Sequence, residues 1–185
     1  MLLVVPSATL ADVSAGFRKV RVPEWAYENV VWEIDLYALE LGLVTDSEWR
    51  LTASYAYSRE EVERTAWQHR TAFCGGLAGF YPLHSLSAMS LGLGGRIEYS
   101  EVYYSSPWQE HNPFTRSWQL SPLLRLDLSL PGLERLGLYT ELGASYVSTR
   151  MMSETQPPIE SGESTSSRWS IRASEDILAG VAWTF

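Results

Sequence analysis

The last segment of the chain, residues 168–185, alternates between two kinds of side chain over an unusual length. Counted back from the C-terminus, every second residue except Glu175 is apolar: Phe185, Trp183, Val181, Ala179, Ile177, Ala173, Ile171 and Trp169. Because successive side chains of a β-strand point to opposite faces, this period predicts a strand between an apolar and a polar environment. Glu175 lies on the apolar face well inside the strand, and one continuous strand gives no reason for it.

The same alternation recurs along the chain and predicts seven further strands. The regular ones are residues 49–58, 88–104, 117–129 and 136–149, and the less regular ones are 12–22, 29–43 and 68–81. In 29–43 we expect one apolar face and one polar face, formed by Trp32, Ile34, Leu36 and Ala38 against Glu33, Asp35 and Tyr37. This segment is also compatible with a helix between Pro23 and Gly42, but we favour a strand.

One stretch, residues 71–95, carries no Asp, Glu, Lys or Arg and is long enough to cross a bilayer as a helix. Its six glycines and Pro82 are poor helix material. The central residues, YPLHSLS, are typical of a turn. We therefore predict two strands joined by that turn.

The connections between the eight predicted strands alternate between short turns and longer polar loops, although the first connection, PEWAYE, is short. The short ones are TDSE, PLHSLS and PGLERLG, and the longer ones include REEVERTAW, SSPWQEHNPFTR and MMSETQPPIESGESTSS. Short turns at one end and longer loops at the other are typical of an up-and-down β-barrel of the outer membrane. The even strand number places both termini at the short-turn, periplasmic end. The predicted fold class is therefore all-β, an eight-stranded antiparallel up-and-down transmembrane barrel.

Composition limits the remaining possibilities. A net charge of −8 argues against nucleic-acid binding, which needs a basic face. The single cysteine, Cys74, excludes an internal disulfide, and no metal or cofactor motif is present, so we expect no cofactor. Residues 1–11 combine an apolar stretch with the small residues around Leu10, and we interpret them as the remnant of a signal peptide. Residues 12–185 then form a single domain.

The polar faces of the predicted strands suit a barrel interior rather than a solvated surface. They hold many small residues, as the narrow interior of an eight-stranded barrel requires. Their ionisable residues are six of each sign, without lysine: Arg18, Arg50, Arg70, Arg96, Arg125 and Arg172 against Glu33, Asp35, Glu98, Asp127, Glu141 and Asp176. Buried charges must be paired, and arginine suits such pairing. We predict a structural charge network in the lumen formed by Arg96, Glu98, Arg125, Asp127, Glu141, Arg172 and Asp176.

Aromatic residues fall near both ends of the apolar faces, as in the belts at membrane interfaces. Those predicted at the periplasmic end are Trp49, Trp183 and Phe185. Those predicted toward the loops are Trp32, Tyr55, Tyr57, Tyr99, Tyr103, Trp118 and Tyr146.

With these strands, belts and a terminal Phe185, nearly the whole chain after Ala11 resembles the small bacterial outer-membrane barrels exemplified by the OmpA transmembrane domain and OmpX. The resemblance implies that Trp183 and Phe185 belong to a signal read by the barrel-assembly machinery during biogenesis. It also implies a monomer in the bacterial outer membrane, in contact with membrane lipid and lipopolysaccharide. We expect a closed lumen and a structural or surface-interaction role through the loops.

Two other functions stay open. A lipid-modifying enzyme of the outer leaflet, such as a lipid A deacylase or acyltransferase, would need a serine beside a histidine that an acid orients. His69 and His111 are candidates, with Ser105, Ser106 and Glu110 nearby in sequence, but the pattern HNPF does not match the barrel deacylases and we expect no enzyme. The other alternative is a soluble lipocalin-like binder with its faces inverted. We also expect Lys19 and Arg21 to lie near lipopolysaccharide phosphates.

Overall fold

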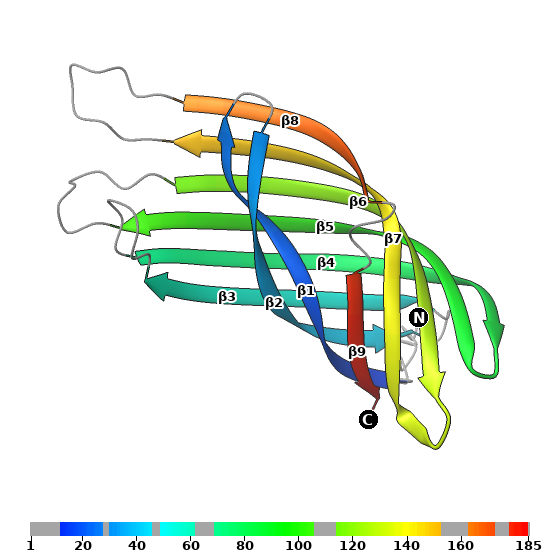
Figure 1. The fold of residues 1–185 in the computed structure, drawn as a ribbon. Coiled ribbons are helices and arrows are strands. Elements are labelled where there is room, and N and C mark those ends of the chain that lie inside the picture. Colours follow the sequence, from blue (N-terminus) through cyan, green and yellow to red (C-terminus); the bar gives the residue numbers. More distant parts are fainter. Residues whose placement is uncertain are drawn as a thin grey trace, which may run out of the picture.

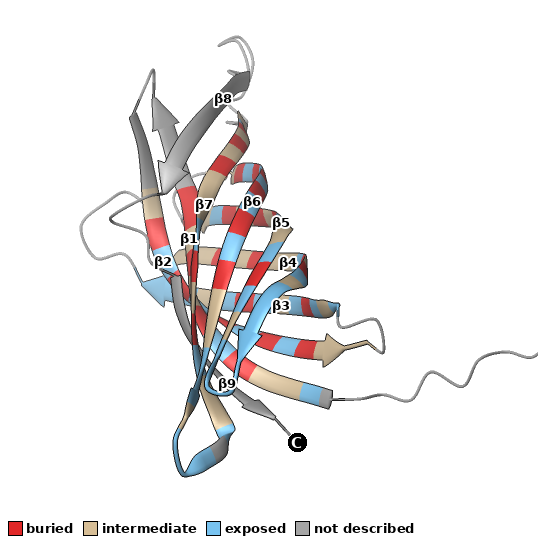
Figure 2. Ribbon diagram, turned by 90° about the vertical axis from the view of Figure 1, so that its right-hand side faces the viewer, coloured by how far each residue is buried: buried red, intermediate tan, exposed pale blue. Residues whose placement is uncertain are grey.

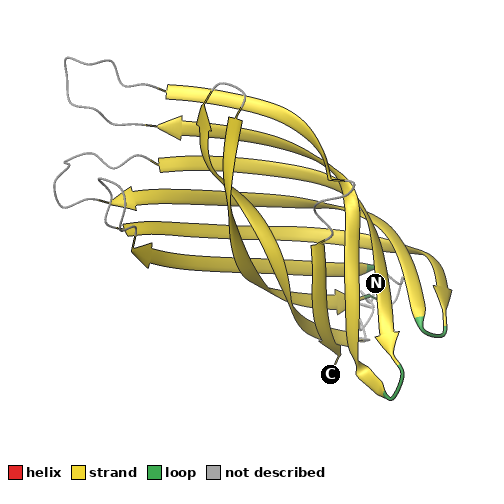
Figure 3. Ribbon diagram, viewed as in Figure 1, coloured by secondary structure: helices red, strands yellow, loops and turns green. Residues whose placement is uncertain are grey.

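The computed structural model describes residues 12–27, 30–45, 49–61, 69–105, 114–152, 163–172 and 178–184. Every regular element in these ranges is a strand, as Figure 3 shows. The strands are β1 (Asp12–Tyr27), β2 (Val30–Val44), β3 (Arg50–Glu61), β4 (His69–Leu86), β5 (Met89–Ser105), β6 (Phe114–Leu130), β7 (Leu133–Met152), β8 (Glu163–Arg172) and β9 (Leu178–Thr184). No helix in the described ranges is long and apolar enough to cross a membrane.

The strands form one antiparallel, up-and-down sheet that curls around an interior (Figure 1). Each strand from β1 to β7 pairs with the next along the chain. β9 pairs with both β7 and β1 and thereby links the two ends of this series. The prediction of an all-β antiparallel up-and-down sheet is confirmed, and residues 29–43 belong to a strand rather than a helix.

The sheet has two distinguishable ends, which we name by their connections. At the turn end, two residues join β4 to β5 and two join β6 to β7, and β1 begins where β9 ends, with Ser14 opposite Thr184. At the loop end, β3 ends at Glu61 and β4 begins at His69, β5 ends at Ser105 and β6 begins at Phe114, and β7 ends at Met152 and β8 begins at Glu163 (Figure 1). We call the corresponding parts of the sheet the turn half and the loop half.

The two tight turns differ in type. The chain passes from β6 to β7 through Pro131 and Gly132, and Gly132 has a φ of 79°. Proline followed by a residue of positive φ is the type II arrangement, which glycine adopts without strain. Between β4 and β5 the turn is Ser87–Ala88, farther along the chain than predicted, because β4 continues past Pro82. The register shifts between Pro82 and His84, the kind of irregularity that lets a strand tolerate a residue lacking an N–H group.

The prediction of one continuous strand over residues 168–185 is wrong. β8 pairs Arg172 with Gly143, and β9 pairs Leu178 with Glu141, so both lie along β7. Between these pairs β7 moves by two residues (143 − 141) while the partner chain moves by six (178 − 172). The difference of four residues means that β8 and β9 do not follow β7 in one continuous register. Glu175 and Asp176 belong to residues 173–177, outside the described residues.

Hydrogen bonding around the sheet differs between the two halves. In the turn half β2 pairs with β3 from Leu39 to Val44, and β1 pairs with β9 from Ser14 to Arg18. In the loop half the β1–β2 hairpin keeps its own ladder as far as Tyr27, but within the described ranges no ladder joins it to β3 or β8. The hairpin instead bends over the interior, and β1 contacts β5, β6 and β7 across it (Figure 1).

That bend buries an apolar core in the loop half (Figure 2). The hairpin places Val20, Val22, Ile34, Leu36 and Ala38 against small or apolar residues of the facing strands, namely Ala56, Ala72, Cys74 and Val102. The outer face of the same hairpin carries Lys19, Arg21 and Asp35, which are partly or largely exposed.

The predicted faces of residues 29–43 are therefore wrong. Ile34, Leu36 and Ala38 are buried in the interior instead of facing outward, whereas Asp35 and Tyr37 are exposed, Tyr37 by 75%. The physical reason is that this part of the strand has an apolar interior to fill.

Candidate functional site: a buried charge cluster

Six ionised side chains meet in the interior of the turn half, and we call them the charge cluster: Arg18, Glu40, Arg96, Glu98, Arg125 and Glu141. Five different strands supply them, since Arg18 comes from β1, Glu40 from β2, both Arg96 and Glu98 from β5, and the last two from β6 and β7. No side chain of the cluster is more than 6% exposed. Three arginines face three glutamates, so the buried charge is balanced.

Glu40 lies at the centre of the charge cluster and contacts all three arginines. Its Oε2 accepts hydrogen bonds of 3.2 Å from Arg18 Nε and from Arg96 Nη2. Its Oε1 accepts a third, also of 3.2 Å, from Arg125 Nη1. One carboxylate from β2 thereby ties together strands on opposite sides of the interior.

Glu141 forms the second node. Arg96 donates to both of its carboxylate oxygens, with 2.9 Å from Nη2 to Oε1, which is the two-bond geometry that arginine and carboxylate favour. Arg125 Nη1 lies 3.2 Å from the same Oε1. Arg18 in turn donates to Glu98 and, over 3.2 Å, to Ser54 Oγ. Each glutamate therefore has at least one arginine partner, as burial of a carboxylate requires.

The cluster continues toward the turn end through Asp127. Arg125 Nε lies 3.1 Å from Asp127 Oδ1, and Arg50 pairs with the same carboxylate. Beyond this pair a cavity of about 230 Å³ opens, and its lining includes Arg50, Phe80, Ser85 and Asp127. Solvent exposure rises there, to 32% for the Arg50 side chain.

Aromatic and glycine residues shape the space around the cluster. The Arg125 guanidinium carbon lies 3.7 Å from the ring centroid of Tyr139 and 5.3 Å from that of Phe80, both favourable cation–π positions. Gly76 leaves room for Glu98, because a Cβ there would lie 2.8 Å from Glu98 Cγ. A Cβ at Gly94 would lie 2.8 Å from the Phe80 ring and 2.0 Å from the Gly79 carbonyl oxygen, so only glycine fits.

Side chains from several strands meet in the interior. Arginine and glutamate side chains bridge it in the turn half, and the apolar core fills it in the loop half. Among the described residues, no group of three or more His, Cys, Asp and Glu is arranged to hold a metal ion.

The structure brings five of the predicted network residues together: Arg96, Glu98, Arg125, Asp127 and Glu141. Of the others, Arg172 lies opposite Gly143 in the ladder, and Asp176 is outside the described residues. Trp183 lies in β9 opposite Ala15 and Leu136, and Phe185 is outside the described residues.

Sequence reasoning missed Glu40, the centre of the cluster. The signal for it is a change of parity within β2. Apolar residues occupy even positions from Ile34 to Ala38 and odd positions from Leu39 to Leu43. β1 shows the same change, from Val13, Ala15 and Phe17 to Val20 and Val22. The even-numbered residues of β2 face the interior along the whole strand. Glu40 therefore lies inside with Ile34 and Leu36, and Asp35 lies outside.

Two of the candidate catalytic residues, His69 and Ser105, lie at the loop end. His69 pairs in the ladder with Glu61 on β3 and with Ser105 on β5, so the three form a row on the outer face. No hydrogen bond joins these three described side chains. His111, Ser106 and Glu110 are outside the described residues. On the same face, Lys19 Nζ lies 2.6 Å and Arg21 Nε 3.5 Å from the two oxygens of Asp35.

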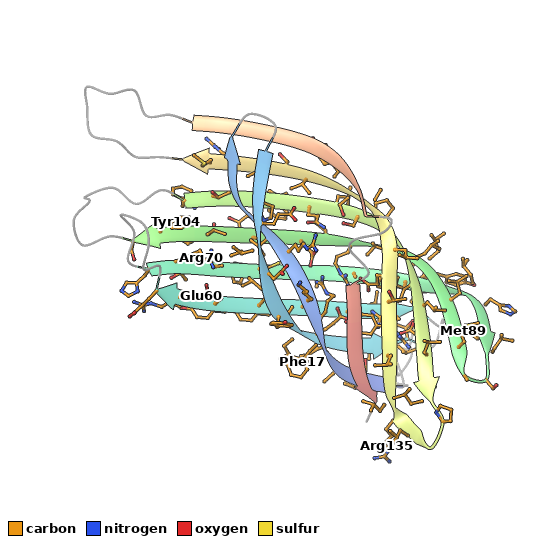
Figure 4. All side chains as sticks on the ribbon, viewed as in Figure 1. Phe17, Glu60, Arg70, Met89, Tyr104 and Arg135 are labelled. Carbon is orange, nitrogen blue, oxygen red and sulfur yellow. The ribbon has the colours of Figure 1, made fainter. Side chains whose placement is uncertain are left out.

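The outer face of the turn half is apolar. Phe17, Leu77 and Leu120 are 63%, 63% and 55% exposed, and Phe17 projects outward from β1 in Figure 4. Aromatic pairs lie at both margins of this apolar band. Trp49 and Tyr81 pack at the turn end with ring centroids 5.4 Å apart, and Tyr99 and Trp118 pack toward the loop end at 4.7 Å.

Comparison with known proteins gives the fold. No family model and no curated protein matches the chain. Among solved structures, a major outer membrane protein from Thermus thermophilus is similar, with a TM-score of 0.51 and 15% identity over 97% of this chain and 100% of that one. The Ail protein of Yersinia pestis, its attachment invasion locus protein, gives a TM-score of 0.45 and 13% identity over 94% and 97%. At these identities, the similarity to the Thermus protein shows a shared fold.

Proposed function

We propose that the chain is an eight-stranded outer-membrane β-barrel with a closed, charge-paired interior, and that its role is structural or in surface interaction through the loop-end segments. In this proposal β8 and β9, which both pair with β7, together make the eighth strand. One observation carries it: in the turn half the apolar side chains are outside and the ionised ones are inside. A soluble barrel has the opposite arrangement, whereas a barrel in lipid needs this one.

The height of the apolar band supports a membrane-spanning role. On β5 the outward-facing residues run from Met89 to Tyr99, which are ten residues apart. None of the outward-facing residues from Met89 up to Tyr99 has an ionisable side chain before Tyr99 itself. At about 3.4 Å per residue and a tilt of about 45°, this row is about 24 Å tall. The apolar band of outer-membrane barrels is about 25 Å tall.

The change of parity in the β1–β2 hairpin supports the same placement. Where the band ends, the hairpin turns its apolar face inward and its charged face outward. Such an inversion is expected where the surroundings of a strand change from lipid to water. The similarity to the Thermus outer membrane protein agrees with the proposal.

Cell fractionation and gel mobility test this function. We expect the protein in the outer-membrane fraction, resistant to extraction by urea, and with a mobility in detergent gels that shifts on boiling. A protein that stays in solution without detergent would contradict the proposal and favour the lipocalin-like binder. Removal of Phe185 tests its proposed recognition by the assembly machinery, with slower appearance of the heat-shiftable form as the expected result and removal of Met1 as the control.

A second candidate function has one observation in its favour, the row formed by Glu61, His69 and Ser105. Directly opposed residues of neighbouring strands have Cβ atoms about 5 Å apart, so rotation of these side chains can connect acid, imidazole and hydroxyl. Ser105 Oγ would attack an ester carbonyl of a lipid, His69 would take the hydroxyl proton and return it to the leaving alcohol, and water would then release the fatty acid from Ser105.

Mass spectrometry of membrane lipids tests the enzyme. If the row is catalytic, cells making the native chain accumulate deacylated lipid and cells making Ser105→Ala do not. Ser58→Ala, a serine on the neighbouring strand outside the row, is the control. An identical lipid profile with native protein and with Ser105→Ala would exclude this activity.

A further inference from the structure

The β1–β2 hairpin leaves the sheet at the same level on both of its sides. On one side, the ladder between β2 and β3 ends at the pair of Leu39 with Tyr55. On the other side, the ladder between β1 and β9 ends at the pair of Arg18 with Gly180. Within the hairpin Arg18 opposes Ala38, the neighbour of Leu39, so the two ladders end within one residue of each other. The loop half of the hairpin is therefore joined to the sheet at a single level.

Beyond that level β3 has an open edge. We call residues 19–27 and 30–38 the bent hairpin, because they turn into the interior there (Figure 1). β3 continues from Ala56 to Glu61 and pairs throughout with β4. Within the residues that the structure describes, no ladder joins the other edge of this segment to a neighbouring strand. Such an edge presents N–H and C=O groups with which a further strand can pair.

The register of the turn half gives the bent hairpin a matching position along this edge. Continuing the β2–β3 ladder two residues beyond its last pair brings Tyr37 opposite Tyr57. Two further residues on each strand bring Asp35 opposite Arg59. Opposite charges that face each other directly across two strands stabilise the pairing. The edge of β3 is thus complementary to β2 in the register that the turn half already has.

The side chains of these two pairs lie on the outer faces of their strands. Tyr37 and Tyr57 are 75% and 57% exposed, and Arg59 is exposed as well. Asp35 Oδ2 lies 2.6 Å from Lys19 Nζ, and both residues belong to the bent hairpin. The hairpin can therefore keep this ion pair while Asp35 approaches Arg59.

The inner faces allow the same register. Ala38 would oppose Ala56, and both of these small side chains are buried. No bulky pair therefore keeps the two strands apart where the ladder would continue. Two residues beyond Asp35, the register would bring Glu33 opposite Glu61, which is not a favourable pair, so the match ends at Asp35.

The apolar core holds the bent hairpin inside. Val22 and Leu36 pack there with Cys74 and Val102. Pairing with β3 would add backbone hydrogen bonds at the edge, but it would draw the hairpin toward the wall of the sheet and away from Val102. Burial of apolar surface and completion of the ladder thus favour two different positions of the same segment.

We propose that the bent hairpin is a lid with two arrangements, the inward one described above and a laddered one in which residues 35–38 pair with residues 56–59. The laddered arrangement withdraws Val22 and Leu36 from the interior and opens the loop half toward the loop end, which uncovers Cys74. The charge cluster lies on the other side of the level where the ladders end and stays in place. The proposal goes beyond the structural or surface-interaction role, and it does not depend on the membrane placement because every contact it uses lies within the chain.

Disulfide formation tests the register. In a chain with Cys74→Ala, Tyr37→Cys and Tyr57→Cys are directly opposed in the laddered arrangement, at about the Cβ separation that a disulfide requires. Tyr37→Cys with Arg59→Cys is the matched control, because these positions are diagonal neighbours about 7–8 Å apart. We expect oxidation of the purified protein in detergent to link the first pair about tenfold faster than the second. Equal rates of linking would overturn the register.

A metal bridge tests whether pairing opens the interior. Tyr37→His and Tyr57→His together place two imidazoles opposite each other, and these bind Ni²⁺ jointly only when the strands pair. The native Cys74, 3% exposed, reports opening through its rate of reaction with a maleimide. We expect Ni²⁺ to raise this rate at least about fivefold in the double variant and to leave it unchanged in Tyr37→His alone. An unchanged rate in the double variant would overturn the lid.

The charged pair gives a test in the otherwise native chain. Arg59→Glu places two carboxylates opposite each other in the laddered arrangement and leaves the apolar core as it is. The reaction of Cys74 with the maleimide should slow by up to about fivefold, because the open arrangement becomes rarer. Arg135→Glu makes the same change of charge at the turn end (Figure 4) and should leave the rate unchanged. A rate that does not fall in Arg59→Glu would mean that Asp35 and Arg59 do not meet, which contradicts the proposal.

Discussion

The interior is filled by charged side chains in the turn half and by apolar side chains in the loop half. In the turn half, arginine and glutamate side chains span the interior and the apolar residues lie outside. In the loop half, valine, leucine and alanine fill the interior and Lys19, Arg21 and Asp35 lie outside. The same two strands, β1 and β2, contribute to both arrangements. The even-numbered residues of both strands face the interior throughout, so the polarity of the inner face changes along the strands while its parity does not.

The contrast identifies the sequence feature that indicates a change in the surroundings of the sheet. Alternation alone indicates that the two faces of a strand have different environments, but it does not show which face is in contact with water. A switch of alternation within one strand, at the same level as in its hairpin partner, indicates that the outer environment itself changes. Arg18 and Ala38 are opposed in the ladder at that level, with Phe17 and Leu39 below them and Val20 and Leu36 above.

The largest expected effect is in the turn half, at Glu40. Glu40→Ala leaves three buried arginines sharing two glutamates, and loss of one partner from a buried ion pair costs about 3–5 kcal/mol. We expect the free energy of unfolding to fall by about that amount, measured by urea titration of the protein in lipid vesicles. Glu60→Gln breaks the exposed pair with Arg70 at the loop end (Figure 4), 2.5 Å in length, and should change stability by less than about 1 kcal/mol. Equal effects would mean that the cluster is not the centre of the fold.

The next effect concerns the apolar core of the loop half. Leu36→Ala removes a buried side chain beside Val20 and Val22, and such truncations cost about 2–5 kcal/mol. Because Cys74 lies in the same core and is the only cysteine, its reaction with a maleimide should become faster when the hairpin loosens. Tyr37→Ala, the exposed neighbour in the chain, is the control and should leave the rate unchanged. Equal rates in the two variants would mean that the hairpin is not held by this core.

A smaller effect tests the outer faces. Leu77→Arg places a charge in the middle of the apolar band, which in outer-membrane barrels costs about 2–4 kcal/mol. Tyr37→Arg places the same charge on the outer face of β2, two residues from Asp35, where the expected cost is near zero to about 1 kcal/mol. Folding into vesicles, followed through the heat-dependent gel shift, measures both. A soluble barrel would tolerate both variants equally.

Much of this fold could be predicted from the sequence, because successive side chains of a strand face opposite sides and their polarity indicates the surroundings of each side. Residues 88–104 and 117–129 were assigned correctly to inner and outer faces, since β5 and β6 have exposed apolar side chains on one side and the charge cluster on the other. The inner positions of Arg96 and Arg125 followed directly from that parity.

Two features were not accessible, each for a physical reason. The inward bend of the hairpin depends on contacts between Val22 or Leu36 and distant Val102, which no local pattern encodes. The register on β7 shifts by four residues between β8 and β9. Because four is an even number, the two-residue alternation is the same on both sides of the shift, and the sequence alternates as one continuous strand would.

The smallest expected effect is at an exposed ion pair of the loop half, which we compare with a buried ion pair of the turn half. Lys19 and Asp35 are 42% and 48% exposed in the loop half, with Nζ and Oδ2 2.6 Å apart. Water screens such a pair, so Lys19→Gln should lower the free energy of unfolding by less than about 0.5 kcal/mol, and added salt should abolish even that difference. Arg96→Gln, in the buried pair with Glu141, should cost several times more, and salt should leave its effect unchanged because ions do not enter the interior. The effect of salt on the two destabilisations therefore distinguishes the exposed pair from the buried pair better than the size of either destabilisation does. If both variants respond alike to salt in vesicles, water reaches the charge cluster and the interior of the turn half is not closed.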